Sequence, residues 1–359
     1  MTQIKNFNFS VKYKAPKELK TLLKQGTSAG GNEWNRLNLP VTDMKSTVYL
    51  ECMGSKRAKL KVYCARKDEN DKVENFQKEI TWAERLNKSL IEELASFAKY
   101  TLVIGEEKQV FATEWDFNNA VYNAIVDGQF DNKTLFIRGQ ILYSEYKGKP
   151  QQKFKPSYIQ VNDSDKLYMS GEVSFSFTGD AMDIESGRSK NQVYIDGHVL
   201  DYNSDIKEKT FYKRTFVMDY SELEKLEGEA KEKAIKKFGF MKKCFQGKST
   251  DKVYEMGFLT SFVMGSEEVE LTIDDLTEFE KDSLEYGYTL EDIKKARGTK
   301  RGDFRQDTLL LMPLLSVYPN GVIEVETLTP ADLVTKKSVE LVSADEVIGD
   351  VFNEDDLPF

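Results

Sequence analysis

The stretch Thr47-Val-Tyr-Leu-Glu-Cys52, followed by Lys59-Leu-Lys-Val-Tyr-Cys64, alternates apolar and other side chains with the period of a β-strand. Between the two runs, Gly54-Ser55-Lys56-Arg57 has the composition of a hairpin connection. One face of the expected hairpin belongs to a core and carries Val48, Leu50, Cys52, Leu60, Val62 and Cys64. The other carries Tyr49, Lys59, Lys61 and Tyr63. This stretch therefore predicts an antiparallel β protein with a mixed aromatic and basic outer face.

Aromatic rings interleaved with cations suit single-stranded DNA, because unpaired bases stack on rings while Lys and Arg follow the phosphates without reading sequence. Tyr and Lys are also ordinary on the solvated face of any antiparallel sheet, and that alternative stays open. The candidate DNA-binding residues of this region are Trp34, Arg36, Tyr49, Lys56, Arg57, Lys59, Lys61, Tyr63 and Arg66.

A second hairpin is expected from residues 135–143 and 154–161, joined by the turn-rich Tyr146-Lys-Gly-Lys-Pro150. Its excess of basic and aromatic residues suggests a finger that clamps a strand. The candidates are Arg138, Tyr143, Tyr146, Lys147, Lys149, Lys153, Phe154 and Lys155.

A weak internal echo links residues 136–143 to residues 194–202, and each run leads into a basic second strand. The echo suggests two related β modules, although its 58-residue offset is shorter than a domain and also fits shared strand chemistry. The added candidates are Tyr194, Tyr202, Lys213 and Arg214.

Helical spacing predicts helices over 85–100, 115–126 and 221–240, the last beginning with the capping-box pattern Ser221-Glu-Leu-Glu224. Acidic helices follow, with Thr289 as a cap. The apolar run 309–315 is expected to form a buried strand that returns, after the turn signal Asn320-Gly321, through residues 322–327.

Composition supports a globular protein, with 359 residues of which 40% are hydrophobic and 12% aromatic. The three cysteines have no metal-ligand spacing, and neither a leader nor an apolar run of membrane length appears. Gln246-Gly-Lys-Ser-Thr250 lacks the first glycine of a phosphate-binding loop, and His198 is the single histidine. We therefore expect a cytoplasmic protein without catalytic residues, metal or cofactor.

Charge is distributed unevenly along the chain. The net charge is -9, yet residues 1–67 hold fourteen Lys and Arg against four acids, whereas residues 340–359 hold seven acids and no base. Glycines at 26, 30 and 31 favour a flexible basic arm over residues 1–33. A basic N-terminal segment together with an acidic C-terminal tail is compatible with nucleic-acid binding despite the negative total.

The final residues put an acidic run before an apolar plug: Glu354, Asp355, Asp356, Leu357, Pro358 and Phe359. This tip resembles the C-terminal tip of bacterial single-stranded DNA-binding (SSB) proteins, and the resemblance covers about the last fifteen residues. It implies that Asp355, Asp356, Leu357, Pro358 and Phe359 bind replication, recombination or repair proteins. A short acidic C-terminus otherwise means solubility.

The expected fold is mainly β with helical insertions, forming one or, as we prefer, two OB-like barrels. The expected boundaries are a flexible arm over 1–33, barrels over 34–165 and 166–330, and a disordered acidic tail over 331–359. The resemblance implies a non-enzymatic protein that coats single-stranded DNA in the cytoplasm. The length and the short charged linker depart from the family and suggest a phage-encoded or divergent version.

The alternatives are a DNA-processing enzyme, such as a nuclease or primase-like factor, and an interaction protein that borrows the tip without touching DNA. The oligomeric state is left open.

Overall fold

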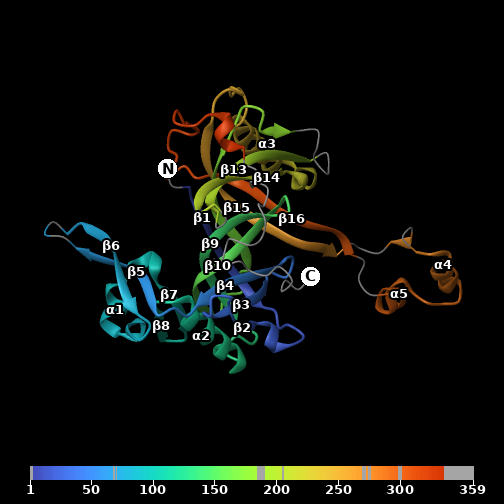
Figure 1. Cartoon of the computed structure of the whole chain (residues 1–359). Coiled ribbons are helices and arrows are strands. Elements are labelled where there is room, and N and C mark those ends of the chain that lie inside the picture. Colours follow the sequence, from blue (N-terminus) through green and yellow to red (C-terminus); the bar gives the residue numbers. More distant parts are fainter. Residues whose placement is uncertain are drawn as a thin grey trace.

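The computed structural model describes residues 3–334 except 68, 70, 184–190, 204–205, 269–271, 274–275 and 298–300 (Figure 1). The described chain is mainly β with few helices, as the alternating sequence predicts. Fifteen of its strands hydrogen-bond into one connected sheet, and two others pair separately. Residues 335–359 lie outside the described residues, so the tail and its tip stay predictions.

Five strands close into a ring, which we call the first ring. Its order is β1, β3, β4, β10, β9 and back to β1. Neighbours are antiparallel except β4 and β10, which meet in parallel where Leu50 lies opposite Phe154. The strands are β1 (Lys5–Tyr13), β3 (Glu33–Thr42), β4 (Thr47–Ser55), β9 (Thr134–Tyr146) and β10 (Lys149–Asn162).

A second ring of five strands follows in the order β11, β13, β14, β16, β15 and back to β11. Its parallel pair is β14 with β16, where Val217 lies opposite Leu309. The strands are β11 (Tyr168–Phe177), β13 (Gln192–Asn203), β14 (Glu208–Asp219), β15 (Tyr254–Glu268) and β16 (Arg301–Pro313).

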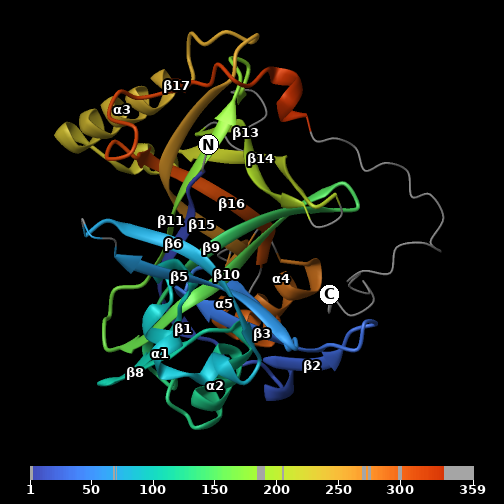
Figure 2. The ribbon, with the colours of Figure 1, turned by 60° about the vertical axis from the view of Figure 1, so that its left-hand side comes forward.

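The two rings have the same connectivity. In chain order, the first strand pairs with the second and the fourth, and the third pairs in parallel with the fifth. An α-helix precedes the fourth strand of each ring, α2 (Glu114–Val126) in the first and α3 (Gly228–Lys243) in the second. Figures 1 and 2 place α3 and α2 at opposite ends of the molecule.

The sequence echo does not mark this structural repeat. Residues 136–143 belong to β9, the fourth strand of the first ring, whereas residues 194–202 belong to β13, the second strand of the second ring. The echo therefore reflects similar strand chemistry. The equivalent first strands are β1 and β11, and they pair with each other from Lys5 opposite Val173 to Ser10 opposite Tyr168.

The expectation of a flexible arm over residues 1–33 is wrong where this segment forms the strands β1 and β2 (Leu23–Thr27). β1 lies at the junction of both rings, and Phe7, Phe9 and Val11 are fully buried. These residues alternate with Asn6, Asn8 and Ser10, a strand signal that the glycines farther along obscured. β2 then pairs with β3. The first ring consequently begins at Lys5 rather than Trp34.

The expected hairpin of residues 47–64 is also wrong, although both strands exist. β4 pairs with β3 and β10, while β5 (Lys59–Lys67) pairs with β6 (Val73–Thr81) in an arm outside the first ring (Figure 1). Val62 and Cys64 pack with Leu90 and Leu94 in a small separate core. The alternation identified the inward faces but could not identify the partners.

The helices follow the expected pattern only in part. α2 is as predicted, and Asp116 N donates to Thr113 Oγ1 at its start. Residues 85–100 divide into two 3₁₀ turns and α1 (Lys88–Glu93), with Leu90 and Leu94 buried but Leu86 and Phe97 exposed. Thr289 caps α5 (Leu290–Arg297), which follows α4 (Glu278–Glu285).

The helix expected at Ser221 begins at Gly228 instead, because Ser221 bonds to the Asp219 carboxylate and opens only a 3₁₀ turn. The return strand expected at 322–327 is wrong as well. β17 (Ile323–Glu324) pairs with β15 and not with β16. The run 309–315 is half buried, since Leu310 and Leu314 are enclosed while Met312 and Leu315 are exposed.

The interiors of the two rings form one continuous aromatic core. Phe154 on β10 lies 5.5 Å from Phe7, 5.2 Å from Phe9 and 4.9 Å from Phe262, measured between ring centroids. Since Phe262 belongs to β15, the core of the first ring continues into the second. No helix in the described part of the chain is long and apolar enough to cross a membrane.

Gly54 allows α2 to approach β4 closely, and replacing it with alanine is expected to destabilise the protein. A Cβ there would lie 2.4 Å from the backbone nitrogen of Trp115, so the helix must move. We expect Gly54→Ala to lower the free energy of unfolding by about 1–3 kcal/mol or more, measured by denaturant titration. Gly239→Ala is the control, because nothing lies within 4 Å of its Cβ position in α3. Equal stabilities for the two variants would contradict this packing.

Candidate nucleic-acid interface

The outer face of β3 and β4 carries the first group of predicted residues. Val48, Leu50 and Cys52 point into the core, so Tyr49 points outward and is 59% exposed. Trp34 and Arg36 point outward from β3, opposite Ser55 and Met53. The Trp34 ring packs over Gly26 of β2, where a Cβ would lie 2.7 Å from the ring. One surface thus presents two aromatic side chains and a guanidinium.

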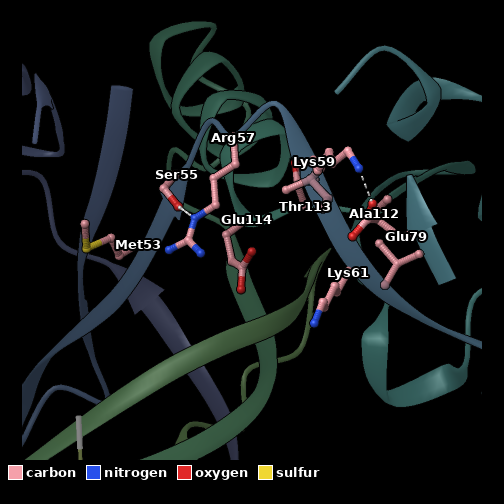
Figure 3. A pocket seen from close by; sticks show the side chains of 11 residues that line it. Met53, Ser55, Arg57, Lys59, Lys61, Glu79, Ala112, Thr113 and Glu114 are labelled. Atoms are coloured by element: carbon pink, nitrogen blue, oxygen red, sulfur yellow. Dashed lines mark hydrogen bonds and ion pairs between the residues drawn. The ribbon is translucent and has the colours of Figure 1, made fainter. Parts of the chain in front are cut away.

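Beyond Ser55 this face opens into a hollow of about 450 Å³, which we call the β5 hollow (Figure 3). Three predicted cations line it, Arg57, Lys59 and Lys61, together with Glu79 and Glu114. Arg57 precedes β5, Lys59 and Lys61 are in its first residues, Glu79 is on the partner strand β6, and Glu114 begins α2. The structure therefore brings these cations beside the β3–β4 face, although β4 and β5 do not form a hairpin.

Several predicted cations already have carboxylate partners. Their Nζ or Nη2 atoms form ion pairs at Lys56–Glu33 (3.1 Å), Lys59–Glu79 (2.7 Å), Arg66–Glu74 (2.8 Å) and Lys153–Glu51 (2.8 Å). The hydrogen bond between Lys59 and Glu79 raises the pKa of Lys59 and lowers that of Glu79. Exposed ion pairs contribute little to stability, so a phosphate can replace these carboxylates at small cost.

Lys155 is held more firmly. Glu114 Oε1 accepts hydrogen bonds from Lys155 Nζ at 2.9 Å and from the Tyr100 hydroxyl at 2.6 Å. Burial alone would raise the pKa of Glu114, but Lys155 and Tyr100 hold it below its usual value. Burial and the neighbouring Glu114 carboxylate raise the pKa of Tyr100. Lys155 is therefore a cation anchored to Glu114, which lines the β5 hollow.

The second predicted hairpin is confirmed, since β9 and β10 pair along their length. Lys147 and Gly148 form its tip, both with positive φ, as a tight two-residue turn requires. The Lys147 ammonium lies 4.9 Å from the Tyr146 ring, and Lys149 is exposed. The tip thus presents a ring and two cations to solvent.

Two predicted residues of the β9–β10 hairpin, Tyr143 and Phe154, are wrong as contacts to a DNA strand. Tyr143 is 2% exposed and Phe154 is 1% exposed, so neither ring can stack on a base. Arg214 is half-buried, with its guanidinium 5.0 Å from the Tyr143 ring centroid, and burial lowers its pKa to about 10. Its contact with DNA stays a prediction. A basic and aromatic composition did not reveal which residues point inward.

Tyr194, Tyr202 and Lys213 lie on the second ring and do not join the β3–β4 face. Lys213 forms a 2.6 Å ion pair with Asp196 on the facing strand. Tyr202 is 57% exposed. His198 lies on β13, as Tyr202 does. Burial and the nearby Lys213 ammonium lower the pKa of His198. Among the described residues, no group of three His, Cys, Asp or Glu is placed to hold a metal ion.

Sequence reasoning missed several residues that line the β5 hollow: Met53, Ser55, Glu79, Thr113 and Glu114. Met53 and Ser55 had a readable signal, because they continue the outward alternation of Tyr49 along β4. Glu79 and Glu114 come from distant segments, and no local pattern in the sequence places them beside Arg57.

No protein-family model and no curated protein matches this sequence. Among solved structures, the chain is similar to the wild-type single-stranded DNA-binding protein from Thermus aquaticus, with a TM-score of 0.30 and 8% identity over 74% of this chain and 87% of that chain. A deletion mutant of that protein gives a TM-score of 0.29 and 8% identity over 73% and 87%. Likenesses at these TM-scores do not establish a shared fold or function.

Proposed function

We propose that this protein binds single-stranded DNA on the first ring without strong sequence preference and without catalysing a reaction. The observation that carries the proposal is the outward face of β3 and β4, where Trp34, Arg36 and Tyr49 continue into the cations of the β5 hollow. Aromatic side chains stack on unpaired bases of any sequence, and Lys and Arg contact the phosphates.

The connectivity of the rings supports an OB-like reading of each one. An OB fold is a partly open barrel of five β-strands. It binds oligonucleotides across the outer face of its second and third β-strands. In the first ring these β-strands are β3 and β4, which carry the outward-pointing aromatic side chains of Trp34 and Tyr49. The connection after the fourth strand is the tip with Tyr146, Lys147 and Lys149, the second region that OB folds use.

The spacing of the Trp34 and Tyr49 side chains fits two separate bases of one DNA strand rather than a single base. Tyr49 lies six residues along β4 from Ser55, the residue opposite Trp34. At about 3.3 Å per residue the two positions are about 20 Å apart, so each ring holds a different base. One OB-like unit binds about 4–16 nucleotides, so a single DNA strand can contact both Trp34 and Tyr49.

Titration of the purified chain with fluorescent oligo-dT and with a labelled duplex, with and without Mg²⁺, tests the proposed function. We expect tight binding of oligo-dT without metal and much weaker binding of the duplex. Cleavage or synthesis in Mg²⁺ would favour the enzyme alternative. Absence of binding to both probes would favour an interaction protein that does not touch DNA.

Neutralising cations of the β5 hollow is expected to weaken binding through its salt dependence. Each phosphate contact to a single strand contributes about 0.7 to the slope of log affinity against log salt. Arg57→Ala combined with Lys61→Ala should therefore reduce the slope by about 1.4. Lys236→Ala with Lys237→Ala on α3 removes the same charge elsewhere and should leave the slope unchanged. Equal salt slopes for the two double variants would show that the DNA does not contact the cations of the β5 hollow.

We further propose that the tip Asp355-Asp356-Leu357-Pro358-Phe359 recruits replication or repair proteins. Phe359 is its one large ring, and a small interface depends on such an anchor. Deleting residues 355–359 should abolish recruitment while oligo-dT affinity stays within about twofold at moderate salt. Capture of the same partners by the truncated chain would exclude the tip as the anchor.

A further inference from the structure

A second hollow of about 790 Å³ lies where the two rings meet, and we call it the β10 hollow. It is bordered by β7 (Tyr100–Ile104), β8 (Glu107–Phe111), β9, β10, β1 and β11. Its lining includes Phe97, Tyr100, Lys108, Arg138, Lys155 and Tyr158. Only Arg138 and Lys155 of these are among the DNA-binding candidates that the sequence suggests.

A β-bulge builds this hollow. In a regular strand Lys155 and Tyr158 would point to opposite faces, because they are three residues apart. The register of β10 against β9 shifts between Pro156 and Tyr158, and both side chains line the same hollow. Bulges commonly re-aim side chains beside functional sites. Gly139 makes the close approach possible, since a Cβ there would lie 2.0 Å from the carbonyl oxygen of Lys155.

Arg138 is positioned on aromatic rings rather than by an acid. Its guanidinium lies 4.4 Å from the Tyr158 ring centroid and 5.6 Å from that of Phe136. No carboxylate of the described residues forms an ion pair with Arg138 or Lys108. A stacked guanidinium keeps its hydrogen-bond donors available for a phosphate.

The charge of the hollow favours an anionic ligand. Four cations line it, Lys99, Lys108, Arg138 and Lys155, whereas Glu172 is the one carboxylate among the described lining residues. Lys155 is engaged with Glu114. The aromatic rings of Phe97, Tyr100 and Tyr158 lie among these cations, an arrangement that fits bases and phosphates together.

The β10 hollow and the β5 hollow are neighbours on the first ring. Glu114 lines the β5 hollow and bonds to Lys155 and Tyr100, which line the β10 hollow. On the arm, Tyr63 follows Lys61 on the outward face of β5, and its ring lies 5.6 Å from that of Phe97. The two hollows are therefore adjacent, both at the Glu114 contact and where Tyr63 of the arm meets Phe97.

We propose that the β10 hollow is a second binding site for the same single strand, so that the strand wraps from the β3–β4 face around the first ring. This inference rests on the proposed function. Phosphates bind Arg138 and Lys108, and a base stacks on Tyr158 or Phe97. A short oligonucleotide fills the β3–β4 face alone, and a long one also occupies the β10 hollow.

The test compares a short oligo-dT of about 8 nucleotides, a length that one OB-like unit can hold, with a long one of about 30, which exceeds the site of one unit. Arg138→Ala combined with Lys108→Ala should weaken binding of the long oligonucleotide about tenfold and reduce its salt slope by about 1.4. Binding of the short one should stay within about twofold. Lys236→Ala with Lys237→Ala on α3 is the charge-matched control.

A second readout is direct: photo-crosslinking of a long oligonucleotide that contains iodouridine should label Tyr158 or Phe97. Unchanged affinity and slope for both lengths, without such labelling, would remove the β10 hollow from the path. Equal weakening at both lengths would also overturn the proposal, since the hollow would then be part of the primary site. If the unaltered chain binds neither length, the proposed function itself fails.

Discussion

Replacing Phe154 with alanine is expected to lower the free energy of unfolding by about 3–5 kcal/mol, the usual cost of removing a buried phenylalanine ring. Phe154 is 1% exposed and contacts Phe7, Phe9 and Phe262, which come from both rings. Its removal leaves a cavity where the two interiors meet. Urea or guanidinium titration followed by far-UV circular dichroism measures the change.

Tyr49→Ala is the matched control, because Tyr49 points outward one residue before Leu50, the partner of Phe154. Its effect on stability should stay within about 0.5 kcal/mol. A Phe154→Ala protein as stable as the unaltered chain, but with weaker oligo-dT binding, would contradict the assignment of Phe154 to the core.

Removing both aromatic side chains of the β3–β4 face is expected to have the largest effect on DNA binding. Base stacking on one ring is worth about 1–3 kcal/mol. Trp34→Ala with Tyr49→Ala should therefore weaken oligo-dT binding between about 30-fold and about 10⁴-fold. Because Trp34 packs over Gly26, unfolding titrations must accompany the binding measurement.

Tyr202→Ala is the control for this pair. Tyr202 is 57% exposed, close to the 59% of Tyr49, but it lies on the second ring. It should leave the affinity within about twofold. Equal losses from Tyr202→Ala and from the double variant, with folding intact, would move the binding surface away from the β3–β4 face.

The alternation of buried and exposed side chains along individual β-strands could be predicted from the sequence. Val48, Leu50 and Cys52 are buried as expected, and Tyr49 between them is exposed. The β9–β10 hairpin was predictable because a turn of Lys147 and Gly148 joins adjacent strands. Both results depend on local chemistry, namely the two-residue period of a strand and the backbone freedom of glycine.

Strand partners could not be predicted, since they depend on contacts between distant segments. β4 meets β10 across about a hundred residues, and the insertion from β5 to α2 separates them in sequence. Phe154 and Tyr143 illustrate the same limit at the site. Both strands were predictable, but the residues that bury these side chains come from distant segments. Phe154 packs on Phe7, Phe9 and Phe262, and Tyr143 lies against Arg214 of the second ring.

Photo-crosslinking of the full chain to iodouridine-substituted oligo-dT, followed by mass spectrometry of the labelled peptides, tests the central claim most directly. We expect crosslinks to peptides that contain Trp34, Tyr49 and Tyr63, because rings that stack on bases lie within reach of the halogenated base. Excess unlabelled single strand should suppress them, and excess duplex should not. Crosslinks confined to β13 and β14, or none despite measurable binding, would contradict a DNA-binding face on the first ring.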